Sequence, residues 1–251
     1  MTTVYVATHK SYEIAPDELY RPIHVGHERS SVETGFPGDD TGRHISASNR
    51  NYCELTATFW AAYNTTHDAT GLVHYRRYFA GSGWRGTATE ADVTSWLSSA
   101  DVIAPRRRNY VIETIRSHYA RAHHETDLDH ARNAVALLSP AYLADFDAIM
   151  NGRRLSLYNM FIMRGILLRE YADWLFPILA EAEEHIPLAG YGPQQARVLG
   201  YLGERLFNVW IHHNADRLRV KYVRVVNLEG ENLAKKAWGM LRRRSGAGRV
   251  S

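Results

Sequence analysis

The segment "ATGLVHYRRYF" (residues 69–79) combines the pattern of a buried strand with a cluster of cationic and aromatic side chains. Its apolar first half is typical of a buried strand, and a histidine, two arginines and two tyrosines follow directly. Ligands bind outside the carboxyl ends of strands in open α/β sheets, so a binding site is expected here. Alternation along a strand predicts that His74 and Arg76 share one face, and Tyr75 and Arg77 the other. Arg76 and Arg77 cannot both be buried without a partner, so at least one needs an anion, which is either a phosphate or diphosphate ligand or a structural carboxylate.

Other β-rich segments alternate with helical ones along the chain. The segments expected to form strands are residues 3–8, 69–75, 100–105, 154–163 and 221–228. The segments expected to form helices are one that begins near Asn51, where Glu54 has capping-box spacing, and residues 84–99, 165–186 and 193–214. This alternation predicts a layered α/β fold, with a mainly parallel sheet and helices on both faces. One domain is expected over residues 1–230, followed by a basic tail at 231–251.

Composition and length indicate which classes of protein the chain can belong to. The 251 residues are 45% hydrophobic and 23% charged, as in ordinary soluble globular proteins, and the formal net charge of +3 is too small to predict a nucleic-acid partner. No apolar run approaches the ~20 residues that span a bilayer. The first residues, "MTTVYVATHK", are typical of a strand and not of a signal peptide. Cys53 is the only cysteine, so an intramolecular disulfide and a cysteine-based metal cage are excluded. A cytoplasmic protein is predicted.

The segment "GDDTGRHISASNRNYCELT" (38–56) is a second candidate for the site. Its adjacent acids, Asp39 and Asp40, have two interpretations: they bind a divalent cation, or they are solvated turn residues. Asn49 and Glu54 are expected to bond sugar hydroxyls or to brace the arginine pair.

The segment "SHYARAHHETDLDH" (117–130) carries four histidines. Such a cluster suggests a metal, but it lacks HExxH or any other dedicated spacing, so an exposed helix-to-loop segment is the favoured interpretation. Asp127, among these imidazoles, is a candidate general base.

The helix expected at 193–214 has two stripes. Its polar stripe either faces solvent or lines a pocket, and its members are Arg197, Tyr201, Glu204 and Asn208. No segment matches GxGxxG, GxxxxGK[ST] or GxSxG, so dinucleotide-binding, P-loop and α/β-hydrolase interpretations lack their main support.

A resemblance to a known family covers nearly the whole chain, from about residue 3 to 228. It rests on "THKSY" (8–12), "PIHVG" (22–26), "NRNYCELT" (49–56), "HYRRYF" (74–79), "YNMFIM" (158–163) and "RVLGYLGERL" (197–206). These motifs are similar to those of the domain-of-unknown-function family found in bacterial capsule, O-antigen and exopolysaccharide loci. Some members of that family are assigned as glycosyltransferases, notably galactofuranosyltransferases. One departure is Arg43-His44, where members often carry Gly-Asp or Asp-Asn.

The resemblance implies a GT-A-like fold, Rossmann-related, and a function. In GT-A enzymes an apolar strand ends in Asp-x-Asp, which holds a metal on the donor diphosphate. In this chain His74 and Arg76 occupy the positions of the two aspartates. Fixed cations are therefore expected to take the role of an obligatory metal, and a divalent metal is possible but not favoured. The implied donor-binding residues are His9, Lys10, His74, Arg76, Arg77 and Asn159. The residues expected to bind substrate or to support the site are Asn49, Glu54, Tyr75, Arg197 and Tyr201. The catalytic candidates are Asp127, Glu204 and His74, the last as base or phosphate ligand.

The resulting hypothesis is a transferase that uses a nucleoside-diphosphate sugar, with UDP-galactofuranose as the suggested donor. Its acceptor would be a growing cell-surface polysaccharide or a glycolipid. Two alternatives remain: a non-catalytic polysaccharide-binding or scaffold subunit of a capsule assembly complex, and a metal-dependent hydrolase built on the histidine cluster. The tail "NLAKKAWGMLRRRSGAGRVS" (232–251) combines apolar and basic residues, which suits either an interfacial helix on the inner face of an anionic membrane or a packed terminal helix.

Overall fold

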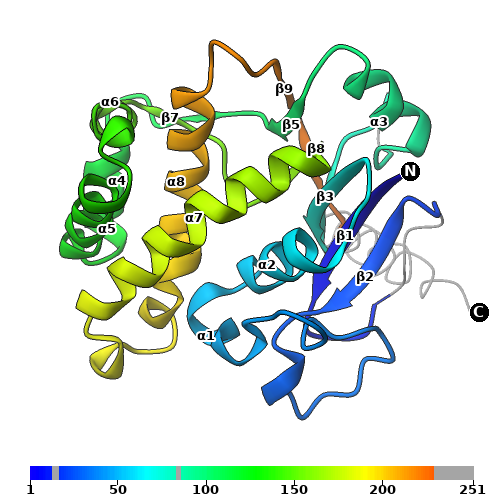
Figure 1. Cartoon of the computed structure of the whole chain (residues 1–251), viewed down its shortest axis with the longest axis horizontal. Helices are drawn as coiled ribbons and strands as arrows, with labels where there is room; N and C mark the ends of the chain where they lie inside the picture. The colour runs from blue at the N-terminus through cyan, green and yellow to red at the C-terminus, as the bar shows by residue number, and fades with distance from the viewer. Residues whose placement is uncertain (13–16, 83–85, 229–251) are drawn as a thin grey trace, which may run out of the picture.

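The computed structural model describes residues 1–12, 17–82 and 86–228. Within these residues the main sheet has eight strands (Figure 1). They are β1 (Thr2–Thr8), β2 (Tyr20–His24), β3 (Ala69–His74), β4 (Arg77–Phe79), β5 (Val102–Pro105), β8 (Phe161–Arg164), β9 (Val220–Val223) and β10 (Val225–Asn227). A separate ribbon pairs β6 (Arg108–Asn109) with β7 (Arg154–Leu155).

The sheet is mixed, which differs from the mainly parallel sheet that the sequence predicted. β1 lies between β2 and β3 and is parallel to both, and β9 is parallel to β5. Between β3 and β5 runs β8, which is antiparallel to each of them. β3 and β5 therefore point the same way, and the carboxyl ends of β1, β3, β5 and β9 all lie at one edge of the sheet.

The strand that carries the arginine pair ends earlier than expected. His74 is the last residue of β3 and pairs with Arg77, the first residue of β4, so Tyr75 and Arg76 form a two-residue turn. The expected alternation of side chains through Arg77 is therefore wrong, because the chain reverses after His74. The turn projects Tyr75 and Arg76 from the edge of the sheet.

Eight α-helices occur in the described part of the chain. They are α1 (Asn49–Tyr52), α2 (Leu55–Asn64), α3 (Glu90–Leu97), α4 (Ile115–Ala122), α5 (Glu125–Leu138), α6 (Leu143–Asn151), α7 (Gly165–His185) and α8 (Val198–His213). None of those helices is long and apolar enough to span a membrane.

Several sequence-based boundaries need correction. The strand expected at 221–228 is divided into β9 and β10 at Arg224, and the helix expected at 193–214 begins at Val198 as α8. The capping box expected at Asn51 does not form, because Cys53 has a φ of 53° and separates α1 from α2. The helix expected from residue 84 begins at Glu90, after a capping box between Thr89 and Asp92. The strand expected at 154–163 is divided into β7 and β8 by a turn at Tyr158 and Asn159, both with positive φ.

Alternate residues of the strands supply two hydrophobic cores, one on each face of the sheet. Leu72 belongs to the core covered by α2, α7 and α8, whereas its neighbour Val73 belongs to the core covered by α3. Figure 1 shows α2 and α7 in front of the sheet, with α4, α5 and α6 beside it. The predicted α/β layering with helices on both faces, in a single domain, is thus confirmed. The predicted tail at 231–251 lies outside the described residues.

Candidate functional site

A pocket opens at the edge of the sheet where β1 and β3 end. It consists of two cavities that share Cys53, Glu54, His74, Arg76 and Arg197, and we call the pair the β3 pocket. The larger cavity, of about 330 Å³, is also lined by Ala7, His9, Val25, Asn49, Arg50, Tyr75 and Pro193. The smaller one, of about 200 Å³, is also lined by Arg77, Tyr158, Gly200, Tyr201 and Glu204. The pocket therefore joins segments that are distant in sequence, among them the ends of β1 and β3, the α1–α2 break, the turn before β8 and the start of α8.

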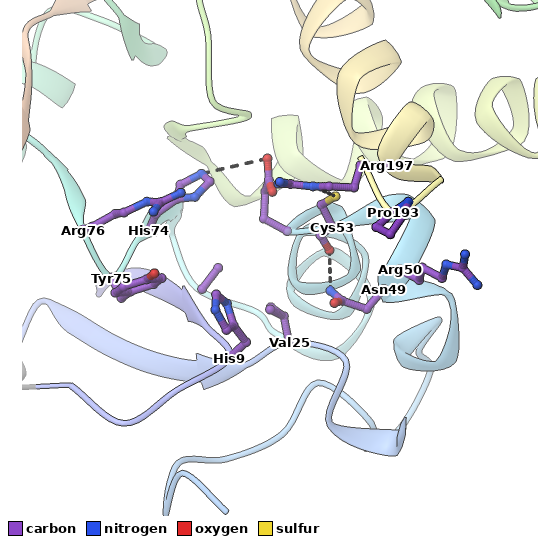
Figure 2. Close-up of a pocket in the computed structure, with 12 residues that line it drawn as sticks. His9, Val25, Asn49, Arg50, Cys53, His74, Tyr75, Arg76, Pro193 and Arg197 are labelled. Carbon is purple, nitrogen blue, oxygen red and sulfur yellow. Dashed lines mark hydrogen bonds and ion pairs between the residues drawn. The ribbon is translucent and has the colours of Figure 1, made fainter. Parts of the chain in front are cut away.

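Positive charge enters the pocket from opposite sides (Figure 2). Arg76 extends from the β3–β4 turn, and Arg197 extends from the position directly before α8. Arg77 lies 4.6 Å from the ring centre of Tyr158, which fixes its guanidinium on the wall of the smaller cavity. Guanidinium groups present planar donor forks that match phosphate oxygens. This arrangement suits an anionic ligand.

Tyr75 is the centre of an aromatic and cationic group at the rim. Its ring is in edge-on contact with His9 at 5.5 Å, and the Lys10 ammonium lies 4.5 Å from the ring centre. Burial, with Lys10 and Arg76 close by, lowers the pKa of His9, which favours its neutral form. The arginines and Lys10, and not His9, therefore carry the charge at this rim.

Two glutamates also line the β3 pocket. Glu54 accepts a hydrogen bond from Asn159 at 2.8 Å, and only 13% of its side-chain surface is exposed. Glu204 accepts from the main-chain amide of Tyr158 at 2.7 Å and from Arg205 at 2.8 Å, with 16% of its side chain exposed. Burial raises the pKa of Glu204, although the Arg205 charge opposes that shift. A carboxylate that is partly exposed and easier to protonate than usual can exchange a proton with a ligand.

His74 lines both cavities and lies near Glu54. Its Nε2 atom lies 2.6 Å from the carbonyl oxygen of Tyr158 and 4.0 Å from Oε1 of Glu54. A carbonyl oxygen only accepts, so Nε2 carries a proton. Burial lowers the pKa of His74, which favours the neutral ring, with Nδ1 as the free acceptor.

Asn159 and Asn49, both predicted as site residues, hold other parts of the pocket in place. Asn159 is 4% exposed and donates to Glu54 and to the carbonyl of Gly200, so it positions Glu54. Asn49 lines the larger cavity and donates to the carbonyl of Cys53 at 2.7 Å. That bond satisfies the carbonyl next to the break between α1 and α2 (Figure 2).

Backbone strain is concentrated at this site. Four non-glycine residues have positive φ in the described part of the chain: Cys53, Val111, Tyr158 and Asn159. Cys53 and Tyr158 line the pocket, and Asn159 holds Glu54. Such conformations cost about 1–3 kcal/mol each and occur preferentially at functional sites.

Cys53 is a pocket residue that sequence reasoning did not select. Its sulfur accepts a hydrogen bond from Nε of Arg197 at 3.2 Å. Burial raises the pKa of this thiol to about 12, so it is a neutral contact and not a nucleophile. The sequence feature that could have identified Cys53 as a pocket residue is its position next to Glu54 in "YCELT".

Asp127 lies apart from this constellation. It is 1% exposed at the start of α5, where it accepts a hydrogen bond from Tyr191 at 2.7 Å. It is not among the residues that line the β3 pocket. Of the two acids predicted as bases, the structure brings only Glu204 to the pocket.

The histidines of residues 117–130 do not converge on one point. His118 packs on Tyr110, and His130 on His185, whereas His123 and His124 pack on Tyr201 and Tyr191. No group of three His, Cys, Asp or Glu side chains in the described residues is arranged to hold a metal ion.

Asp39, one of the acids considered for a cation, has a structural role. It is fully buried and accepts from the main-chain amides of Gly26 and His27 and from the hydroxyl of Ser46. Asp40 bonds His27 at 2.8 Å.

Comparison with known proteins places the chain in a family. The sequence matches the family described as "Domain of unknown function (DUF4422)" over residues 3–215. The fold is similar to a solved structure described as the apo form of the WbbM bifunctional glycosyltransferase, with a TM-score of 0.84 and 29% sequence identity. That likeness covers 90% of this chain but 45% of the other one, so the chain spans less than half of its length. No curated protein matches the sequence. The β3 pocket is thus the candidate site of a chain that belongs to the DUF4422 family.

Proposed function

We propose that this chain is a glycosyltransferase that moves a sugar from a nucleoside-diphosphate donor to a saccharide or lipid-linked saccharide acceptor of the cell surface. UDP-galactofuranose is the donor that the sequence resemblance suggests. The observation that carries the proposal is the pocket at the ends of β1 and β3, which is lined by arginines from opposite sides and by two glutamates. The likeness to a protein described as a glycosyltransferase supports it.

In this proposal Arg76, Arg77 and Arg197 bind the donor diphosphate. Their charges would stabilise the negative charge that grows on the diphosphate as the sugar leaves. A divalent metal would fit poorly here, because Glu54 is bonded to Asn159 and Glu204 to Arg205, and the other charged groups of the pocket are basic. No step of the proposed reaction therefore requires a metal.

Glu204 is the proposed base. The acceptor hydroxyl would attack the anomeric carbon while the bond to the diphosphate breaks, and Glu204 would take the hydroxyl proton, as inversion of configuration requires. Its second oxygen stays paired with Arg205. Nδ1 of neutral His74 is another acceptor of the pocket and would orient a substrate hydroxyl.

The two other hypotheses make different predictions about ligands. A non-catalytic polysaccharide-binding or scaffold subunit would bind no nucleoside diphosphate. A hydrolase built on the histidine cluster would need a metal that these four separated imidazoles do not surround.

Arg76→Ala is expected to weaken UDP binding by about 1.5–3 kcal/mol, roughly 10- to 150-fold, because it removes a charge-assisted contact with phosphate. Isothermal titration calorimetry in EDTA measures this for the wild type and the variant. Arg29→Ala, at an exposed arginine outside the pocket, is the control and should bind UDP normally. Equal affinities for wild type and Arg76→Ala, or loss of wild-type binding in EDTA, would refute the proposed diphosphate site.

The C-terminal segment is proposed to hold the enzyme at the inner face of the plasma membrane through residues 232–249. Its basic residues would each contribute about 1 kcal/mol near an anionic surface. Truncation after Glu231 should abolish co-sedimentation with anionic liposomes. If both proteins pellet equally, or if anionic lipid makes no difference, the segment has no membrane role.

A further inference from the structure

A second polar pocket lies at the same edge of the sheet, outside the β3 pocket. Its volume is about 480 Å³, and the residues that line it are Arg106, Arg107, Asn109, Arg154 and Tyr222. We call it the arginine pocket. Arg106 and Arg107 follow β5 directly, and Tyr222 lies in the parallel strand β9. The arginine pocket therefore opens where β5 and β9 end, which is a ligand-binding position in this class of fold.

The chemistry of the arginine pocket is that of an anion site. Pairing of β6 with β7 sets Asn109 opposite Arg154, so their side chains share one face. Arg107 donates to the hydroxyl of Tyr222 at 2.6 Å and lies 4.3 Å from the ring centre, which holds its guanidinium in place. None of the five lining residues is acidic. Three guanidinium groups and an amide offer donors that match phosphate oxygens.

The arginines of this pocket have no carboxylate at ion-pair distance among the residues that the structure describes. Some other arginines of the chain do have such a partner, as Arg132 is paired with Asp147 at 2.7 Å. Three like charges around one cavity repel one another, and a bound anion would offset that repulsion.

An apolar pocket of about 180 Å³ adjoins the arginine pocket. The two pockets share Arg107 and Tyr222. The other walls of the apolar pocket include Ile149, Ile211, Leu218 and Val220. Together they offer a charged end and a nonpolar end to one ligand.

Helix α8 connects the apolar pocket with the residue proposed as the catalytic base. Asn208 of α8 lines it and donates to the main-chain carbonyl of Glu204, one helical turn earlier. One turn of helix rises about 5.4 Å, so α8 carries Asn208 and Glu204 in successive turns, each on the wall of a different pocket.

We propose that the arginine pocket binds the phosphate of a second ligand, and that the apolar pocket takes a nonpolar group next to that phosphate. If the proposed transferase function holds, on which this step rests, the ligand is a phosphate-bearing acceptor of that reaction. The phosphate is either borne by a lipid or part of a soluble ester, and both present the same anionic group to the arginines.

Calorimetric titration with inorganic diphosphate, with UDP present to fill the β3 pocket, tests the site on the full chain. Arg106→Gln/Arg154→Gln should weaken the remaining diphosphate binding roughly 10- to 100-fold, because two charge-assisted contacts are lost. UDP affinity, measured separately, should stay within about twofold, as expected for independent sites. The control Arg21→Gln/Arg29→Gln removes the same charge from exposed positions and should change neither affinity.

Three results would overturn the second site. They are no diphosphate binding beyond that of the UDP site, equal weakening in both double variants, and loss of UDP affinity in Arg106→Gln/Arg154→Gln. The last would mean that these arginines belong to the donor site. Failure of the proposed function would look different, because Arg76→Ala would then leave UDP binding unchanged whatever the arginine pocket does.

Vesicles distinguish the two sources of phosphate. The full chain is sedimented with phosphatidylcholine vesicles that contain or lack a long-chain prenyl phosphate. Recruitment that disappears in Arg106→Gln/Arg154→Gln supports a lipid-borne phosphate in the site. No recruitment, with diphosphate binding intact, supports a soluble phosphate ester.

Discussion

Replacement of Glu204 by Gln is expected to lower turnover about 10²–10⁴-fold while UDP affinity changes little. The amide keeps the size of the side chain and its ability to accept from the Tyr158 amide, but it cannot take a proton. Activity with a nucleotide sugar and its acceptor, followed by release of nucleoside diphosphate, measures turnover. Calorimetry on the same preparations measures donor affinity.

The pH dependence separates a base from a structural residue. Burial raises the pKa of Glu204, so wild-type turnover should fall as pH decreases through that raised pKa. Glu204→Gln should lack this acidic limb. A variant that merely loosened the pocket would keep the limb and show weaker UDP binding instead.

Asp127→Asn is the informative comparison for this test. Asp127 was an equal candidate from sequence, but it is buried against Tyr191 and does not line the β3 pocket. Near-normal turnover in Asp127→Asn, with a large loss in Glu204→Gln, would assign the base. Wild-type rates in both variants would place the base elsewhere or imply a retaining mechanism, and a large loss only in Asp127→Asn would make Asp127 the base.

Sequence reasoning found the strand that carries the site because its signal is local. The apolar run before His74 predicts a buried strand, and the fold class then places His74 and Arg76 at the ligand-binding edge. The chain reversal after His74 had no such signal, because Tyr75 and Arg76 are not typical turn residues. Only the pairing of β4 with β3 and β10 reveals it.

The other predictions that differ from the structure depend on tertiary contacts. Cys53, Tyr158 and Asn159 have positive φ without being glycine, so local propensity could not indicate the break between α1 and α2 or the turn before β8. These conformations are maintained by distant partners, such as the bond from Asn159 to Glu54. The separation of Asp127 from the pocket likewise depends on how α5 packs, and no sequence pattern encodes that.

Arg205 should prove indispensable to stability. Its side chain is 5% exposed, and it donates to Glu204 at 2.8 Å and to the carbonyl of Tyr201 at 2.9 Å. Arg205→Met preserves most of the volume but leaves the carboxylate of Glu204 largely buried without its cation. Breaking a buried pair in this way costs about 3–5 kcal/mol. Denaturant unfolding at neutral pH measures the loss as a decrease in the free energy of unfolding.

A double variant and the pH dependence of stability distinguish the contribution of the Glu204–Arg205 ion pair from that of the packing of Arg205. Glu204→Gln/Arg205→Met removes both charges and should recover much of the stability lost in Arg205→Met, because no unpaired charge remains buried. In the wild type the Arg205 charge lowers the pKa of Glu204, so this pKa should rise further in Arg205→Met. The folded state then binds a proton more readily than the unfolded state, so the stability deficit should shrink as pH falls through the raised pKa. A pH-independent loss, unrelieved in the double variant, would instead mean that Arg205 acts through its contacts with Tyr201 and the Tyr119 ring, 4.9 Å away.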